Sequence, residues 1–159
     1  MNKRALIQKI VAALTDELGI YFRAALNSRA EATHEQSKAD NKYDTRGLEA
    51  SYLARGQSKQ AAEVEAAIAE FQKLPVQDFS PADPIGIGAV VELETPEETS
   101  FYFIGPRAGG TEVKHDKKEI LVITPQSPLG SQLMEKKQGD KLQLLIAGRK
   151  QTARIISVA

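Results

Sequence analysis

The sequence contains no cysteine and no tryptophan, and aromatic residues make up only 6% of its 159 residues. The absence of cysteine excludes disulfides, thiolate metal sites and a cysteine nucleophile. Lysine plus arginine and aspartate plus glutamate balance at 21 each, so the basic excess of a general nucleic-acid binder is missing. The chain also lacks a run of about 18 apolar residues, which a membrane-spanning helix needs. We therefore expect a soluble, cytoplasmic protein with a modest core and no membrane partner.

Signatures of common enzyme classes are absent as well. The chain carries no G-x-S-x-G motif, no phosphate-binding loop and no dinucleotide fingerprint. Its two histidines, His34 and His115, do not follow the spacing of metal ligands. His34 could add to a metal site nearby, but a solvated histidine is the favoured interpretation.

Residues 3–36 have the periodicity of one long helix. Apolar residues recur at spacings of three and four and form a single stripe: Ile7, Ile10, Leu14, Leu18, Tyr21 and Ala25. At about 1.5 Å per residue this helix would reach roughly 50 Å, which is too long for the interior of a domain of this size. Lys3, Arg4 and Lys9 add positive charge, which we interpret as a solvated face, with RNA or an acidic protein surface as the alternative partner.

A second helix is predicted from Asp44 or Thr45 to about Lys73. Asp44 or Thr45 can cap its first N–H groups, and Glu49 lies in its first turns, where negative charge suits the helix dipole. Its apolar side consists of Leu48, Tyr52, Ala61, Val64, Ile68 and Phe71. Two narrow apolar stripes joined by a short polar turn predict an antiparallel coiled-coil hairpin over residues 1–75. Two helices of a compact bundle are the alternative.

The segment between these helices, Lys38–Gly47, is called the turn segment below. Asp40 and Asp44 lie in it, and Glu49 follows just beyond it. Carboxylates gathered at one turn could coordinate Mg²⁺, a hard cation that takes oxygen ligands. Ordinary helix capping and solvation are the alternative explanation for these acids.

The pattern changes after the helices. Residues 76–87 are rich in proline and glycine and are predicted to be a linker. From residue 88 to 159 the period falls to two, and the expected strands are 89–94, 100–104, 120–124, 141–146 and 152–158. Ser127 and Pro128 mark the start of a short helix that runs to about Lys136, while the mixed charges of residues 112–119 indicate a solvated loop. The predicted class is α+β, with a small antiparallel sheet and one helix after the hairpin.

Residues 86–158 closely resemble the C-terminal domain of the GreA/GreB transcript-cleavage factors, which has an FKBP-like fold. The residues that carry the likeness are Ser127-Pro128-Leu129-Gly130, Leu133, Lys136-Lys137, Gly139-Asp140 and Ile155-Ile156. Glu49-Ala50-Ser51-Tyr52 is similar to the start of the second helix of that family. The resemblance implies that the protein binds RNA polymerase, with Ser127, Pro128, Leu129 and Gly130 as candidate contact residues.

In that family an aspartate and a glutamate three residues apart lie at the hairpin tip and enter the secondary channel of RNA polymerase. There they help to hold a second Mg²⁺, so that the polymerase hydrolyses its own backtracked RNA. The resemblance therefore implies a factor that is not itself an enzyme, has no cofactor of its own, acts as a monomer and meets the RNA 3′ end only indirectly. Asp44 and Glu49 are the nearest match, but they are five residues apart, with Gly47 between them, and Asp40 is a candidate substitute.

Three alternatives stay open. A related factor could occupy the channel without stimulating cleavage and so modulate transcription. An FKBP-like fold could belong to a peptidyl-prolyl isomerase or chaperone, although fold does not fix function, and Tyr102 and its two phenylalanine neighbours lie on a single strand. The coiled coil could instead pair with a second copy of itself in a purely structural module.

Overall fold

The computed structural model describes residues 1–34 and 57–159, and it places the side chains of residues 1–24 and 59–159. The helices are α1 (Lys3–His34), α3 (Gln57–Lys73) and α4 (Pro128–Leu133). The strands are β1 (Val90–Glu94), β2 (Thr99–Ile104), β3 (Glu112–His115), β4 (Lys118–Ile123), β5 (Lys141–Ile146) and β6 (Arg149–Val158). The chain divides into two compact units. One consists of residues 1–11 and 70–159 and is called the sheet unit below, and the other consists of residues 12–69. None of the described helices combines the length and the apolar character needed to cross a bilayer.

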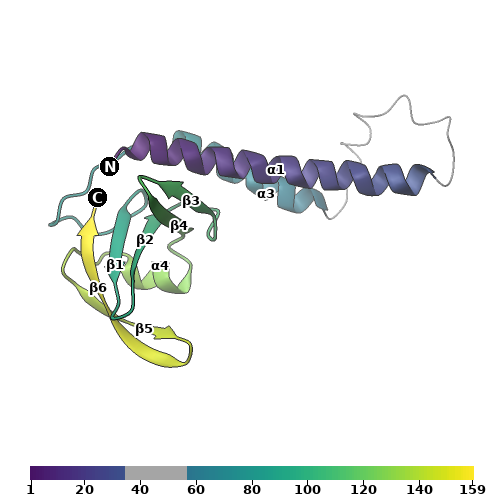
Figure 1. Ribbon diagram of the computed structural model, residues 1–159. Helices are drawn as coiled ribbons and strands as arrows, with labels where there is room; N and C mark the ends of the chain where they lie inside the picture. The colour runs from purple at the N-terminus through teal and green to yellow at the C-terminus, as the bar shows by residue number, and fades with distance from the viewer. Residues whose placement is uncertain (35–56) are drawn as a thin grey trace. The chain divides into compact units, whose positions relative to one another are not determined.

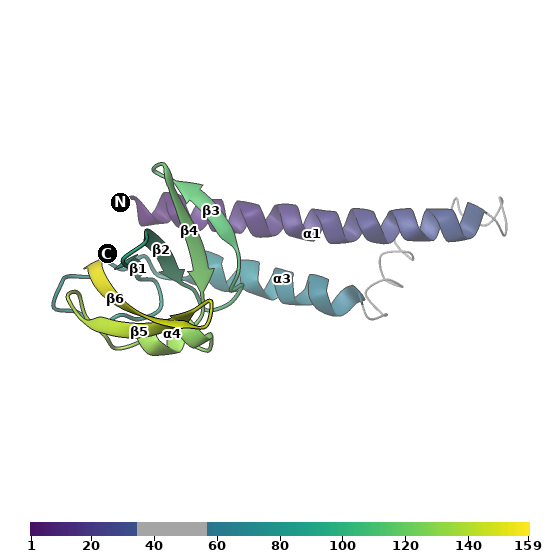
Figure 2. The ribbon, with the colours of Figure 1, turned by 60° about the horizontal axis from the view of Figure 1, so that its bottom comes forward.

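The unit of residues 12–69 contains most of α1 and α3, which run antiparallel and side by side (Figures 1 and 2). Small and branched apolar side chains on one side of each helix are buried, namely Leu14, Ala61, Val64 and Ala67. The first predicted helix is confirmed as far as His34, and the second from Gln57 to Lys73. The predicted start of the second helix near Asp44 or Thr45 lies outside the described residues.

The sheet has the strand order β3-β4-β2-β1-β6-β5. Each neighbouring pair is antiparallel except β2 and β4, which pair in parallel with Phe101 opposite Ile120 and Ile104 opposite Ile123. The parallel pair departs from the expected all-antiparallel sheet. It arises because the chain runs back along β3 before β4 resumes the direction of β2.

Strand β3 corrects the prediction of a solvated loop at residues 112–119. Val113 and His115 are buried, while Glu112 and Lys114 point to solvent, so the segment does alternate with a period of two. Residues 112–119 include six charged residues, which hide this alternation in the sequence. The turn from β3 to β4 consists of Asp116 and Lys117, which both adopt positive φ angles, 50° and 63°. Glycine or asparagine is usual in such turns, so the sequence does not reveal this one either.

One face of the sheet packs against α4. This core takes alternate residues from neighbouring strands, together with Leu133 and the half-buried Leu129 from α4. Its buried members on the strands are Val91, Leu93, Ile104, Ile123, Leu142, Ala153 and Ile155. Helix α4 ends at Leu133, three residues earlier than predicted, because Glu135 adopts a positive φ of 69° and its N–H donates to the carbonyl of Ile85 at 3.0 Å.

The last turn of α3 and the first turns of α1 cover the opposite face. The ring of Phe71 lies 6.1 Å from that of Phe103, centroid to centroid. A side chain at Gly105 would place its Cβ 2.8 Å from the Phe71 ring and 2.9 Å from Val122, so glycine makes room for this packing. Glu70 pairs with Arg107 at 2.7 Å, and the Lys9 ammonium donates to the carbonyl of Lys114 at 3.1 Å.

Lys3 is buried, with 5% of its surface exposed, which corrects the expectation that it lies on a solvated helix face. Its ammonium donates to the carbonyl oxygens of Gln77 and of Gly88, the latter at 2.9 Å, and lies 4.5 Å from the centre of the Phe79 ring. Burial lowers the pKa of Lys3 to about 8, and the Asp78 carboxylate partly opposes that change. Arg4 and Lys9 are exposed as expected.

We expect Lys3→Met to lower the free energy of unfolding of the sheet unit by about 1–3 kcal/mol, because two carbonyl oxygens lose a charged donor. Lys9→Met is the matched control: its ammonium makes one exposed hydrogen bond, so its loss should cost under about 1 kcal/mol. Urea unfolding of the full chain measures both. Equal losses for the two variants would contradict the structural role of Lys3.

The same lysine predicts a pH dependence. The pKa of Lys3 is about 8 in the folded chain and 10.5 as its ordinary value, so the unfolded chain binds more protons between these two pH values. The contribution of Lys3 to stability therefore rises as the pH increases through this window. The gap in unfolding free energy between the wild type and Lys3→Met should widen from about pH 7 to about pH 10. A constant gap over that range would show that the Lys3 ammonium carries no burial cost.

Candidate functional site

The candidate contact residues Ser127–Gly130 form the start of α4. Ser127 is the N-cap of this helix: its Oγ accepts from the N–H of Gly130 at 3.0 Å and donates to the carbonyl of Thr124 at 2.8 Å. Pro128 takes the first helical position, where a missing N–H costs no hydrogen bond. The serine hydroxyl is thus engaged within the chain both as donor and as acceptor.

Gly130 is fixed by space rather than by backbone conformation. A Cβ at this position would lie 1.8 Å from the carbonyl oxygen of Thr124 and 2.7 Å from Ser127 Oγ. Both contacts are shorter than any that real Cβ atoms make, and the first is to backbone, which cannot move away like a side chain. Glycine therefore allows the chain before α4 to approach the helix closely.

The four residues differ in what they offer a partner. Gly130 is buried, Leu129 is half-buried against the core, and Pro128 is exposed. The following turn is also used internally, since the Asp140 carboxylate accepts from the N–H of Lys137 at 2.8 Å. The structure thus assigns most of the predicted contact segment to building the helix start, and Pro128 is the member that presents its side chain to solvent.

The other predicted site residues, Asp40, Asp44 and Glu49, lie outside the described residues. Among the residues that are described, no group of three or more histidine, cysteine, aspartate or glutamate side chains could hold a metal ion. The carboxylates proposed as Mg²⁺ ligands therefore stay a prediction from sequence.

His115 is a buried polar residue that sequence reasoning did not single out. It is 4% exposed, and neither ring nitrogen has a hydrogen-bond partner within the described chain. Its Nε2 lies 3.5 Å from a carboxylate oxygen of Asp116, without hydrogen-bond geometry. The alternation Glu112-Val113-Lys114-His115 is the signal that places this ring on the inner face of β3.

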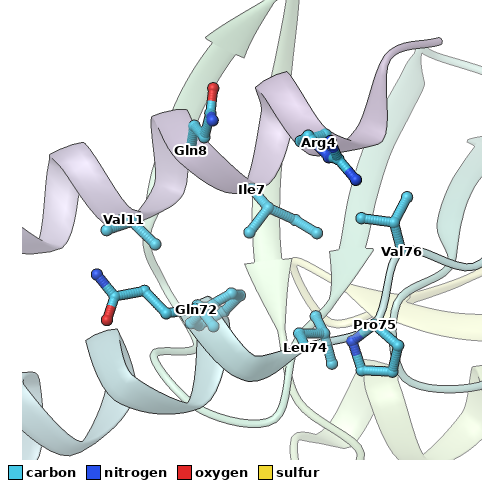
Figure 3. A pocket seen from close by; sticks show the side chains of 9 residues that line it. Arg4, Ile7, Gln8, Val11, Gln72, Leu74, Pro75 and Val76 are labelled. Carbon is cyan, nitrogen blue, oxygen red and sulfur yellow. The ribbon is translucent and has the colours of Figure 1, made fainter.

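A groove of about 650 Å³ lies between the first turns of α1 and the segment that follows α3 (Figure 3). Ile7 and Val11 line it from α1, and Leu74, Pro75 and Val76 line it from the other side. Its polar lining residues are Arg4, Gln8 and Gln72. Because the lining includes no carboxylate, histidine or hydroxyl group, the groove has none of the side chains that acid–base or nucleophilic catalysis uses.

The three aromatic residues of β2 do not all line one pocket. Phe103 is fully buried and Tyr102 is half-buried against the α4 core, so they face opposite sides of the sheet. Phe101 is covered by the Lys118 ammonium, 4.7 Å from the ring centre. Phe101 and Tyr102 both line an open cavity of about 420 Å³ beside β4, together with charged residues such as Lys118 and Glu119, and Phe103 lies outside it.

Comparison with known families gives one match of direct bearing. Residues 80–159, just over half of the chain, match the family model described as transcription elongation factor GreA/GreB, C-terminal domain. The matched range contains the whole sheet and α4. A comparison with curated proteins gives no match.

Several solved structures are similar. Gfh1 of Thermus aquaticus is 25% identical over 91% of this chain and 90% of its own, with a TM-score of 0.41. GreA factor homolog 1 of Thermus thermophilus is 24% identical over 94% of each chain, with a TM-score of 0.39. A GreA/GreB factor of Nitrosomonas europaea is 20% identical over 60% of this chain and 78% of its own, with a TM-score of 0.38.

The geometry around Gly130 makes a steric prediction. We expect Gly130→Ala to destabilise the sheet unit by about 3 kcal/mol or more, because the added methyl meets the Thr124 carbonyl. Gly86→Ala is the control, since its nearest neighbour is the Phe79 ring at 4.0 Å. Thermal unfolding of both variants measures the difference. If Gly130→Ala were as stable as Gly86→Ala, the close approach before α4 would not exist in solution.

Proposed function

Because the chain belongs to the GreA/GreB family of transcription elongation factors, we propose that it binds RNA polymerase and stimulates the cleavage of backtracked RNA. The sheet unit binds the polymerase, and the turn segment enters the secondary channel together with Glu49, which follows it. The family match over residues 80–159 is the observation that carries this proposal. The protein acts as a single copy and is not itself an enzyme, since hydrolysis belongs to the polymerase.

The length of the helices suits the proposed insertion of the turn segment into the channel. α1 has 32 residues and is therefore about 48 Å long at about 1.5 Å per residue. The 17 residues of α3 lie alongside part of its length (Figure 2), and a pair of packed helices is stiffer than a single one. Helices of this length are a rigid means of carrying the turn segment to a site deep within another protein.

The acids Asp44 and Glu49 are the residues that would serve the chemistry, with Asp40 as a substitute. Carboxylate oxygens are ligands that Mg²⁺ accepts while it keeps several waters. Two-metal phosphoryl hydrolysis uses the ions to stabilise the attacking and the leaving oxygen. The factor's contribution is to hold the more weakly bound ion and its water near the RNA 3′ end, and no resident cofactor of its own is involved.

A related function is favoured by one feature of the sequence. Asp44 and Glu49 are five residues apart, whereas the family pairs its acids three residues apart. Residues three apart on a helix share a face, but residues five apart do not. In this version the turn segment occupies the channel without stimulating cleavage, and the factor acts as a modulator of transcription.

The contact with polymerase is tested at the exposed proline of α4. Pro128→Glu should leave the fold intact, because this position is exposed and an acid suits the first turn of a helix. We expect it to weaken binding to RNA polymerase by about tenfold or more if Pro128 lies at the centre of the contact. Gln132→Glu is the matched control, since it adds the same charge at another exposed position of α4. Equal affinities for the two variants would move the contact away from the helix start.

Cleavage is tested on backtracked elongation complexes with labelled RNA and Mg²⁺. The wild type should release short 3′ RNA fragments, and Asp44→Ala or Glu49→Ala should slow release by about tenfold or more, the usual cost of removing a group around a metal. Glu63→Ala removes an exposed acid of α3 and should leave the rate unchanged.

Binding is measured alongside cleavage by competition with a labelled copy of the wild type. If the wild type binds but releases no fragment, the factor is a channel-occupying modulator. If both tip variants cleave at the wild-type rate, Asp44 and Glu49 are not the acting acids, and Asp40→Ala becomes the next variant to measure.

A further inference from the structure

The two edges of the sheet are built differently. Strand β3 forms one edge with four residues, and Glu112 and Lys114 put charges along it. Strand β5 forms the other edge with six residues, KLQLLI, and it pairs without a bulge from Lys141–Arg154 to Ile146–Arg149. Short length and charge protect β3 against pairing with another strand, whereas β5 is long and regular. The β5 edge is therefore the one able to accept an additional strand.

The backbone at this edge has a defined direction. β5 and β6 are joined by Ala147 and Gly148, both with positive φ, so the turn is of the two-residue type that closes on a hydrogen-bonded pair, Ile146–Arg149. Hydrogen-bonded and non-bonded pairs alternate along an antiparallel ladder. The N–H and C=O groups of Lys141, Gln143 and Leu145 consequently point away from β6, toward the open edge. The N–H of Ile155 donates to the carbonyl of Asp140 at 2.9 Å, which fixes the same alternation from the other end.

The side chains at this edge are apolar and basic. Leu145 is 72% exposed and Ile146 is 40% exposed, so two neighbouring apolar side chains at the end of β5 face solvent. On the face that holds Leu145, the exposed charged residues of β5 and β6 are Lys141, Lys150 and Arg154. None of these cations forms an ion pair with another described residue. Acids also lie near β6: Glu94 of β1 is opposite Arg154, and Glu97 accepts from the side chain of Gln151 at 3.5 Å.

From these observations we propose that β5 is a docking edge for an extended, acidic segment of a partner protein, which adds a strand to the sheet beside β5. Backbone hydrogen bonds to Lys141, Gln143 and Leu145 would hold it in register. Acidic side chains of the segment would lie beside Lys141, on the face that also carries Lys150 of β6, and apolar ones would lie beside Leu144 and Ile146. This surface is separate from the start of α4 and does not rest on the proposed contact between that helix and polymerase.

A second copy of the chain and a nucleic acid fit this edge less well than an acidic peptide. In an antiparallel pairing of two copies through β5, the basic faces of both sheets would lie on the same side and repel. A nucleic acid would meet the cations but has no peptide groups to complete the alternating N–H and C=O row. An acidic peptide satisfies both the charge and the backbone.

The test uses the full chain and a fluorescent seven-residue peptide of alternating glutamate and valine. We expect saturable binding with protection of the β5 amides of Lys141, Gln143 and Leu145 from hydrogen exchange. A lysine–valine peptide of the same length tests charge. A glutamate–valine peptide with N-methylated amides tests the backbone, because it keeps the charge and cannot form the ladder. Neither control peptide should bind.

Variants of the chain separate the contribution of the backbone hydrogen bonds from that of the basic side chains. Gln143→Pro removes one outward N–H without touching the bonds to β6 and should abolish binding, while Gln143→Ala should preserve it. Lys141→Glu with Lys150→Glu should weaken binding by about tenfold together. Lys114→Glu, on the opposite edge, should leave it unchanged.

Three results would overturn the proposal. The first is that the N-methylated peptide binds the wild type, or that Gln143→Pro binds the glutamate–valine peptide, as tightly as the wild type binds the unmodified glutamate–valine peptide. The second is a wild-type dimer in sedimentation that Gln143→Pro dissociates, since the occupant would then be a second copy. The third is tight binding of a short RNA that depends on Lys141 and Lys150 with no binding of the glutamate–valine peptide.

Discussion

The sheet is apolar on both of its faces, and this is the constraint on which the rest of the sheet unit depends. In β4, Ile120 and Val122 point to one face while Leu121 and Ile123 point to the other, and all four are at least half-buried. A six-residue helix such as α4 can cover only one of these faces. The other must be covered by residues distant in sequence, and Phe71 and the first turns of α1 supply that cover.

This requirement explains why the first eleven residues belong to the sheet unit. Leu6 and Ile10 are fully buried, and Lys3 reaches carbonyl oxygens 74 and 85 residues further along the chain. Burying an ammonium costs free energy unless its donors are satisfied. Carbonyl oxygens and an aromatic face satisfy Lys3 without a buried partner charge, so the segment that follows α3 is pinned to the start of α1. The pKa of Lys3 is lowered because these contacts offset only part of the free-energy cost of burying its charge.

Local patterns in the sequence predict most of the fold. The helical stripes predict α1 and α3, the alternation of period two predicts β1, β2, β5 and β6, and Ser127-Pro128 predicts the start of α4.

The features that could not be predicted depend on neighbours distant in sequence. Lys3 reads as a surface residue because nothing near it in sequence shows that Gln77, Phe79 and Gly88 surround it. Strand β3 exists because β4 offers it an edge, and its own charges conceal the alternation. The acids near the turn segment lie outside the described residues.

The chain separates the residues that establish its family from those that would decide its activity. The family match rests on residues 80–159, where features such as the space around Gly130 are dictated by packing. A glycine that no side chain can replace is constrained by stability, whatever the factor does to a transcript. Asp44 and Glu49 lie outside the matched residues. The family match therefore does not depend on their spacing. Membership of the family thus rests on one part of the chain, and the proposed stimulation of cleavage rests on another, so the first does not establish the second.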